Sequence, residues 1–536
     1  RISQKYMFRP APKKREKNYD SRRDPQVLPF IVLFLSGASL TFAFAPFYAY
    51  GMAVFAPATL LLFLNNTNRL QGFLRGLIFG IGFFGTAVSW VFVSIHQYAH
   101  VDIITSSVLT FCFIMLFALF IATQSFLFVL SHKYYSNSYF RYLILFPMLW
   151  ILFEAIRGWF LTGFPWVLIA YSQTNSPLKG YVPILGEYGV GFIILFSSGL
   201  LGMWLELFYN SFYKKNKIKL NNRLIVFTFV AMIIWLSGYL FAQIPWTKPD
   251  GPKIKVSLIQ GNIPQEIKWS SEYFYSTIAR YMELSQLENE DVAVQRNQII
   301  IWPESAIAAP SNQVEDLLEA LKRDSNANQL AFITSIPIPV PDSFQYYNGM
   351  IVLGDGQGYY YKRHLVPFGE YVPLMHFLGH LLEFMAIPMS DFAAGPHNQP
   401  PLIAKGIVIG PFICYEVAYA DALKRVLPKA EVLLTVSNDA WFGHSFAGAQ
   451  HLQIAQFRAL QSGRPMLFVS NTGPTAIINQ SGQVQEKVPE FKAVRLTGFV
   501  QPMQGATPWV MIGNSGIVVF ILLFVLFVYR PRKGKK

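Results

Sequence analysis

Long apolar stretches occupy most of the first 245 residues, and one more lies near the end of the chain. A helix needs about 20 apolar residues to cross the hydrocarbon core of a bilayer. Most of the stretches approach that length, although the second and the fifth are short. The pattern predicts a polytopic membrane domain with about eight transmembrane helices. The predicted spans are Val27–Phe47, Tyr48–Leu64, Gly72–Ile95, Ile103–Leu130, Tyr142–Ile156, Tyr188–Phe208, Leu224–Ala242 and Met511–Tyr529.

The pattern changes between residues 243 and 510, where short β-branched apolar runs alternate with polar, helix-like segments. Nearly continuous apolar strands indicate sheets covered by other layers, so we predict an α/β domain here. The predicted strands are Ile254–Gln260, Gln298–Trp302, Leu330–Ile336, Gly349–Leu353, Ile407–Cys414, Val432–Ser437, Met466–Ser470 and Thr475–Ile478. The predicted helices are Tyr273–Glu288, Val314–Arg323 and Ala447–Gln461.

These patterns divide the chain into five segments. The predicted segments are a basic tail 1–26, a membrane domain 27–242 with seven spans, the α/β domain 243–510, an eighth span 511–529 and a second basic tail 530–536. Because Pro46 and further apolar residues follow the first span directly, we expect that span to be an uncleaved anchor rather than a signal peptide.

Charge separates the two kinds of segment. Only 14% of the residues are charged and 53% are apolar, whereas the charged fraction of soluble domains averages about 25%. The formal net charge is +14, yet the chain between Pro245 and Met511 holds 19 Lys and Arg against 23 Asp and Glu, and the remainder holds 25 against 7. The basic excess therefore lies outside the α/β domain, and nothing indicates a nucleic-acid partner.

The basic residues also predict a topology. Lys and Arg concentrate on the cytoplasmic side of membrane proteins, and basic and non-basic loops alternate along this chain, with both tails basic. We therefore expect both termini in the cytoplasm and the segment 243–510 on the far side of the membrane.

The chain has two cysteines. Cys112 lies inside the fourth predicted span, whereas Cys414 ends an apolar run in the exported domain, and we expect the two to be too far apart to bond. Cys414 is then an unpaired thiol in an oxidising compartment, either a small buried hydrophobe or a nucleophile. A nucleophilic thiol needs a nearby base or cation. The eligible histidines are His364, His376, His380, His397, His444 and His451.

Two further side chains could take part in chemistry. Glu304 comes after a buried strand, next to Trp and Pro, where desolvation raises a carboxyl pKa towards the range of a general base; the alternative is an exposed glutamate in a turn. Lys362 follows three tyrosines, and its ammonium could stabilise an oxyanion or simply pair with a surface carboxylate. The sequence alone leaves both choices open.

Together these segments resemble a known family. The motifs, in this order along the chain, are Trp302-Pro303-Glu304, the stretch Tyr361–Glu370, and Cys414-Tyr415-Glu416. They are similar to the Glu-Lys-Cys signatures of the carbon–nitrogen hydrolase (nitrilase) superfamily. With seven spans before them and one after, the chain resembles the membrane-embedded apolipoprotein N-acyltransferases, and so do His364–Tyr371 and Gln260–Gln265.

The resemblance implies an α-β-β-α sandwich in the periplasm of a bacterium, anchored in the inner membrane. It implies a ping-pong reaction in which Glu304 takes the Cys414 proton and the thiolate attacks a phospholipid ester, at the sn-1 position of phosphatidylethanolamine. Lys362 and a backbone N–H would stabilise the oxyanion, and the Cys414 thioester would then acylate the α-amino group of a diacylglyceryl-cysteine apolipoprotein. Neither a metal nor an organic cofactor is implied.

The resemblance also implies further roles. Glu370 and Glu416 would support Lys362 and the thiol, unless they are merely structural carboxylates. Tyr415 and Trp269 would line the entrance for lipid, unless they belong to the core. The apolar segment Pro373–Met389 is either an arm that dips into the outer leaflet or a buried helix. His376 and His380 within it lack the glutamate of a zincin motif, which argues against a metal site.

Two other functions remain possible at this point. A membrane-tethered amidase or nitrilase would use the same three residues with water as the acceptor. A transporter with a large extramembrane domain is a second alternative, but transporters carry ionisable residues or broken helices at the bilayer midplane, and few midplane charges occur here.

Overall fold

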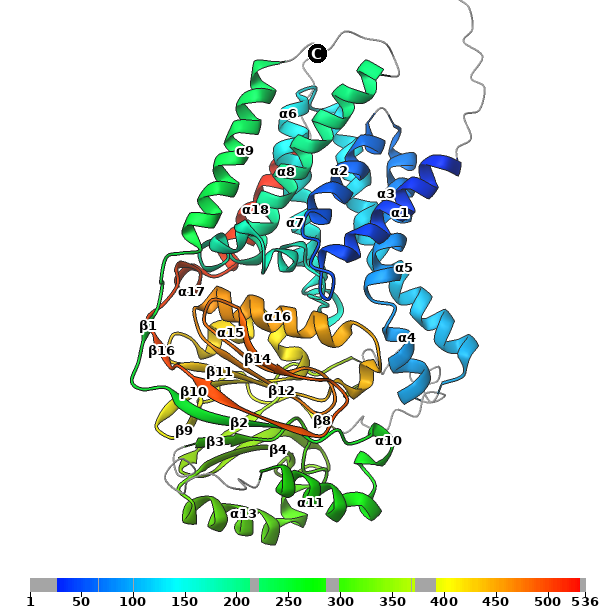
Figure 1. Ribbon diagram of the computed structural model, residues 1–536. Helices are drawn as coiled ribbons and strands as arrows, with labels where there is room; N and C mark the ends of the chain where they lie inside the picture. The colour runs from blue at the N-terminus through cyan, green and yellow to red at the C-terminus, as the bar shows by residue number, and fades with distance from the viewer. Residues whose placement is uncertain are drawn as a thin grey trace, which may run out of the picture.

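The computed structural model describes residues 27–65, 67–99, 101–212, 221–285, 298–367, 369–371 and 392–530. A helical part and an α/β part lie end to end (Figure 1). The predicted arm Pro373–Met389, with His376 and His380, lies outside the described residues.

The helical part contains five segments long and apolar enough to cross a membrane among the described residues. They are α3 (Arg69–Ala87), the segment Ile103–Lys133 that includes α5 (Ile103–Leu130), the segment Ser138–Arg157 that ends in α7 (Phe146–Arg157), the segment Pro177–Phe212 that includes α8 (Val182–Phe212), and α9 (Asn222–Phe241). Shorter apolar helices occupy the first, second and last predicted spans: α1 (Val27–Leu40), α2 (Met52–Leu64) and α18 (Ser515–Tyr529). The membrane-type helices are confirmed, but the number of eight spans is not.

Helix α8 begins earlier than the predicted start at Tyr188. It runs from Val182 across a kink at Gly186, where φ is +61° and a Cβ atom would lie 2.4 Å from the Trp509 ring. Glu187, which directly precedes the predicted span, is therefore buried in this helix. Its carboxylate accepts hydrogen bonds from Gln461 at 2.6 Å and Asn514 at 2.8 Å, and these bonds compensate for its burial.

The α/β part contains two sheets. The first has the order β15-β2-β3-β4-β5-β7, with the bounds Val494–Val500, Ile254–Gln260, Gln298–Ile301, Ala331–Pro339, Tyr346–Gly354 and Tyr359–Tyr361. The second has the order β14-β13-β12-β11-β10-β9-β6, with the bounds Val484–Val488, Thr475–Ile478, Met466–Ser470, Val432–Ser437, Ile407–Ile413, Leu402–Ala404 and Gly356–Gln357. In each sheet the three central strands, β2-β3-β4 and β10-β11-β12, are parallel.

The sheets form the middle of a four-layer sandwich (Figure 1). Apolar side chains from both sheets, including Leu258, Ile409 and Val469, form one buried core between them. Helices α11 (Phe274–Ser285) and α13 (Glu315–Ala327) cover the first sheet, and α15 (Ala420–Val426) and α16 (Ala447–Ser462) cover the second. This confirms the predicted fold class.

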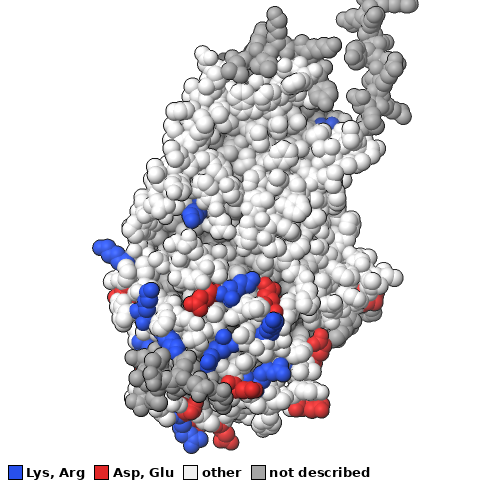
Figure 2. Space-filling model, viewed as in Figure 1, with Lys and Arg blue, Asp and Glu red and all other residues white. Residues whose placement is uncertain are grey.

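Helix α16 lies between the second sheet and the helical part (Figure 1). Gln450 accepts a hydrogen bond from the Trp166 indole at 2.7 Å, and Arg458 lies 3.4 Å from the Glu187 carboxylate. In Figure 2 the charged side chains gather on the α/β part, while the visible face of the helical part carries few. The uncharged surface is the kind that a bilayer covers.

Candidate active site

Cys414 follows β10 at the point where the strand ends. Its backbone φ is +55°, a left-handed conformation that is uncommon for a residue with a side chain and that clusters at functional sites. Cys414 is partly buried as a residue. Glu416, two residues later, is fully buried and accepts hydrogen bonds from the Ile413 and Arg363 N–H groups at 2.9 and 2.7 Å. Glu416 therefore ties the cysteine turn to the segment that carries Lys362.

Lys362 follows β7, and its side chain is 1% exposed. Its ammonium donates to Oε1 of Glu370 at 2.8 Å and to Oε1 of Glu304 at 3.4 Å. Asn348, on the adjacent strand β5, donates to the same two oxygens at 3.0 and 2.8 Å. Two carboxylates, one ammonium and one amide thus form a closed network in which each charge has a partner.

Glu304 follows β3. Its second carboxylate oxygen accepts a hydrogen bond from the Asn438 N–H at 2.9 Å, and its carbonyl accepts one from Lys268 Nζ at 2.8 Å. Ser305, the next residue, has a φ of +49°. The side chain is therefore held on both oxygens, in a turn whose backbone is itself constrained.

The surroundings set the protonation of these groups. Burial raises the pKa of the Cys414 thiol, and the Glu304 charge raises it further, while Lys362 opposes the shift. Burial also acts to raise the pKa of Glu304, but the ammonium groups of Lys362 and Lys268 outweigh it and hold that pKa below its usual value. The Glu370 and Glu304 carboxylates, working against burial, raise the pKa of Lys362. At neutral pH the site therefore holds a thiol, a carboxylate and an ammonium.

Two family models match the chain: the apolipoprotein N-acyltransferase N-terminal domain over residues 36–200, and carbon-nitrogen hydrolase over residues 255–501. The apolipoprotein N-acyltransferase of Coxiella burnetii is 37% identical over 499 residues, which cover 93% of this chain and 99% of the relative. The chain belongs to the apolipoprotein N-acyltransferase family. The predicted resemblance and the predicted enzyme class are thereby confirmed.

A second relative agrees with this membership. The apolipoprotein N-acyltransferase of Methylococcus capsulatus is 38% identical over 490 residues, covering 90% of this chain and 92% of the relative. A solved carbon-nitrogen hydrolase superfamily protein of Xanthomonas campestris is 18% identical, with a TM-score of 0.34 over 51% of this chain and 97% of that chain.

The structure brings together Glu304, Lys362 and Cys414 from the ends of three strands, and adds residues that the sequence analysis missed. Lys268, Asn348 and Asn438 all bond to Glu304. None of them carries a recognisable spacing relative to Glu304, because they come from three other segments of the chain. The motif Gln260–Gln265, which ends three residues before Lys268, is a local signal for that lysine.

Two of the eligible histidines that the structure describes contact groups other than the Cys414 sulfur. His451, on α16, donates from Nε2 to the Cys414 carbonyl oxygen at 3.1 Å, and its Nδ1 lies 3.0 Å from Oδ1 of Asp439. His364 packs on the Tyr419 ring with 3.6 Å between ring centroids, and burial lowers its pKa to about 4. No hydrogen bond from a histidine to the Cys414 sulfur occurs in the described part of the chain.

Two predicted entrance residues differ in their surroundings. Tyr415 packs on the rings of Phe164 and Trp166, and its hydroxyl donates to the Gly163 carbonyl at 3.0 Å. Trp269 is 38% exposed, so its ring is not part of the core. Tyr415, the residue after Cys414, therefore contacts the helical part.

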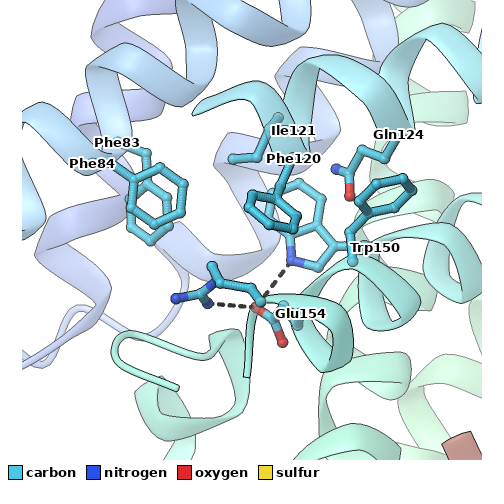
Figure 3. Close-up of a pocket in the computed structure, with 9 residues that line it drawn as sticks. Phe83, Phe84, Phe120, Ile121, Gln124, Trp150 and Glu154 are labelled. Carbon is cyan, nitrogen blue, oxygen red and sulfur yellow. Dashed lines mark hydrogen bonds and ion pairs between the residues drawn. The ribbon is translucent and has the colours of Figure 1, made fainter. Parts of the chain in front are cut away.

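A cavity lies between α3, α5 and α7 in the helical part (Figure 3). Its walls are mostly apolar, and Gln124 and Glu154 line it as well. Arg157, which also lines it, donates to the Trp166 carbonyl at 2.6 Å, and Trp166 packs on Tyr415. The apolar lining consists of Phe83, Phe84, Phe120, Ile121, Trp150 and Phe153. Its volume is about 20 Å³, which is room for about one water molecule.

Proposed function

We propose that this chain transfers an acyl chain from a phospholipid to the α-amino group of an apolipoprotein, through a thioester on Cys414. The observation that carries the proposal is the meeting of a thiol, a buried carboxylate and a buried ammonium beside the helical part. A thiol is a good nucleophile and a thioester is a good acyl donor to an amine, so the covalent route divides one hard step into two easier ones.

In the first half-reaction, Glu304 takes the thiol proton as the sulfur attacks the ester carbonyl. Because the pKa of Cys414 is raised and that of Glu304 is lowered, a free thiolate is scarce, and proton transfer has to accompany the attack. Two of the three N–H donors of Lys362 are used by Glu370 and Glu304. The third is left for the oxyanion, together with a backbone N–H.

Collapse of this intermediate breaks the ester C–O bond, and the proton on Glu304 passes to the leaving oxygen of the lysophospholipid. In the second half-reaction, the amine of a diacylglyceryl-cysteine attacks the thioester and Glu304 removes its proton. The C–N bond forms, the C–S bond breaks, and the thiol is restored. We infer that phosphatidylethanolamine is the donor, through its sn-1 chain.

We also infer that the α/β part lies in the periplasm, with both termini in the cytoplasm and about eight spans in the inner membrane. The alternation of basic loops supports this topology. Tyr415, the residue after Cys414, packs on the Phe164 and Trp166 rings of the apolar helical part, and this nearness supports a lipid substrate.

The experiment uses the full chain in detergent with phosphatidylethanolamine and a diacylglyceryl-cysteine peptide. Mass spectrometry should find one added acyl group on the peptide amine and, with phospholipid alone, one acyl adduct on Cys414. The variant Cys414→Ala should lose both products. Cys112→Ala is the matched control, since this second cysteine is exposed on α5, and it should keep both.

Three results would contradict the proposal. Free fatty acid without acylated peptide would indicate a hydrolase. Activity in Cys414→Ala would exclude the thioester. Transfer of only an sn-2 label, placed on the phospholipid, would exclude the sn-1 assignment while leaving the thioester intact.

A further inference from the structure

Lys268 is a buried cation next to the proposed reacting groups. It ends the short helix α10 (Gln265–Lys268) and is 3% exposed, although lysine is rarely this buried without a charged partner. Its ammonium donates a 2.8 Å hydrogen bond to the Glu304 main-chain carbonyl. A carbonyl does not neutralise a positive charge, so charges further away have to balance this one.

Those charges belong to the proposed reacting pair. Burial lowers the pKa of Lys268 to about 8, against the opposing effects of Glu304 and Cys414. In return, Lys268 is second to Lys362 among the charges that lower the pKa of Glu304. Lys362 bonds to the Glu304 side chain, and Lys268 bonds to the Glu304 main-chain carbonyl. Two ammonium groups from different segments therefore lie near one carboxylate.

Helix α10 is connected to Glu304 by further hydrogen bonds. The Gln265 side chain accepts a hydrogen bond from the Asn438 amide at 2.7 Å, and the Asn438 N–H donates to Glu304 Oε2 at 2.9 Å. Just before the helix, Asn471 bonds the N–H and the carbonyl of Ile263 at 2.9 and 2.8 Å. Lys268 is thus held by a network that includes Glu304.

We propose that Lys268 is a positioning residue for acyl transfer: its ammonium fixes the Glu304 main chain and supplies a second positive charge beside the carboxylate and the thiol. This inference rests on the proposed function. A structural lysine would need only its hydrogen bond, whereas a positioning cation needs its charge, and the two roles differ in their dependence on pH.

The charge dependence has a direction. The groups that face Lys268 are Glu304 after β3 and Cys414 after β10, with Lys362 and Glu370 beyond Glu304. The pKa values of Cys414 and Lys362 are both raised, so neither group loses its proton near pH 8. The rate of Cys414 acylation should therefore fall above about pH 8 as Lys268 loses its charge.

The test measures Cys414 acylation by phosphatidylethanolamine across pH 6 to 10, by mass spectrometry at short times, in the full-length protein. Lys268→Met removes the charge and should lower the rate by roughly ten- to hundredfold at pH 7. Lys268→Arg keeps a charge at all these pH values and should extend the activity to higher pH. Lys405→Met is the control, because Lys405 also donates to a main-chain carbonyl, that of Gln329, outside the site.

Thermal unfolding of each variant separates folding from chemistry. Slow acylation in Lys268→Met with a wild-type Tm supports the inference. So does a shift to higher pH of the alkaline fall in acylation rate in Lys268→Arg. Wild-type rates in Lys268→Met would overturn it, and so would a lower Tm combined with an unchanged pH profile. If the wild-type chain forms no adduct on Cys414, the proposed function fails first; if it does and Lys268→Met equals it, only this inference fails.

Discussion

Glu416 joins the segment of Cys414 to the segment of Lys362, and replacing it with glutamine tests that connection. Its carboxylate is fully buried and accepts four hydrogen bonds. Oε1 accepts from the Arg363 and His364 N–H groups at 2.7 and 3.1 Å, and Oε2 accepts from the Ile413 N–H at 2.9 Å and the Tyr360 hydroxyl at 2.9 Å. Every lone pair of this carboxylate therefore has a donor.

In Glu416→Gln one oxygen becomes an NH2 group, which faces two donors and can accept from neither. A hydrogen bond to a charged group contributes about 1.5–3 kcal/mol, so two lost bonds amount to roughly 3–6 kcal/mol. Part of this loss is offset because a neutral amide is easier to bury than a carboxylate. We expect a net destabilisation of about 2–4 kcal/mol, which lowers Tm by roughly 4–8 °C.

The assay combines thermal unfolding in detergent with the rate of Cys414 acylation at a temperature where the variant is folded. The rate should fall together with Tm, because the turn of Cys414 loses its link to Lys362. Glu431→Gln is the control, since that carboxylate accepts from the Val408 N–H at 2.7 Å at the opposite end of β10. A Glu416→Gln protein with wild-type Tm and wild-type acylation would refute this reasoning.

Three other predictions follow from the same contacts. His451→Leu removes the hydrogen bond to the Cys414 carbonyl and should slow acylation by about tenfold, measured at matched folded fraction; an unchanged rate would show that the bond does not position the thiol. Arg458→Met leaves Glu187 without its ion pair and should cost about 3–5 kcal/mol, seen as a lower Tm that Glu187→Met partly restores in the double variant. The pKa of Glu304 is held below its usual value of 4.5, so the acylation rate should persist down to pH 4.5 and fall at lower pH. The contribution of the ionised carboxylate to stability should be lost over the same range as the pH falls. A fall of the acylation rate near pH 6 would contradict this.

The buried strands were predictable because they are short apolar runs bounded by polar residues. β2, β11, β12 and β13 have the predicted bounds. β14 was missed because it is an edge strand whose middle residues are exposed, and its alternation of charged and polar residues lacks the apolar run that identifies a buried strand. The start of α8 was missed because a glycine and a glutamate interrupt the apolar pattern there.

Glu304 and Cys414 could be picked out by their places at the ends of predicted strands, and Lys362 by the family resemblance. Lys268 and His451 could not, because their roles depend on contacts with main-chain carbonyls. A carbonyl acceptor leaves no trace in the sequence, since every residue has one. Such residues become visible only when the fold brings the donor to a particular peptide group.

The segment that follows Cys414 is supported from both parts of the molecule. Arg458 on α16 donates to the carbonyl oxygens of Val417 and Ala418 at 3.1 and 2.6 Å, and the same guanidinium donates to the Tyr171 hydroxyl and pairs with Glu187 in the helical part. Without the helical part, this arginine would keep its carbonyl partners but lose the carboxylate that neutralises it. Tyr415 also contacts the helical part. The position of Cys414, the proposed nucleophile, therefore depends on both the α/β part and the helical part. The helical part therefore does more than anchor the α/β part: it completes the support of the turn on which Cys414 lies.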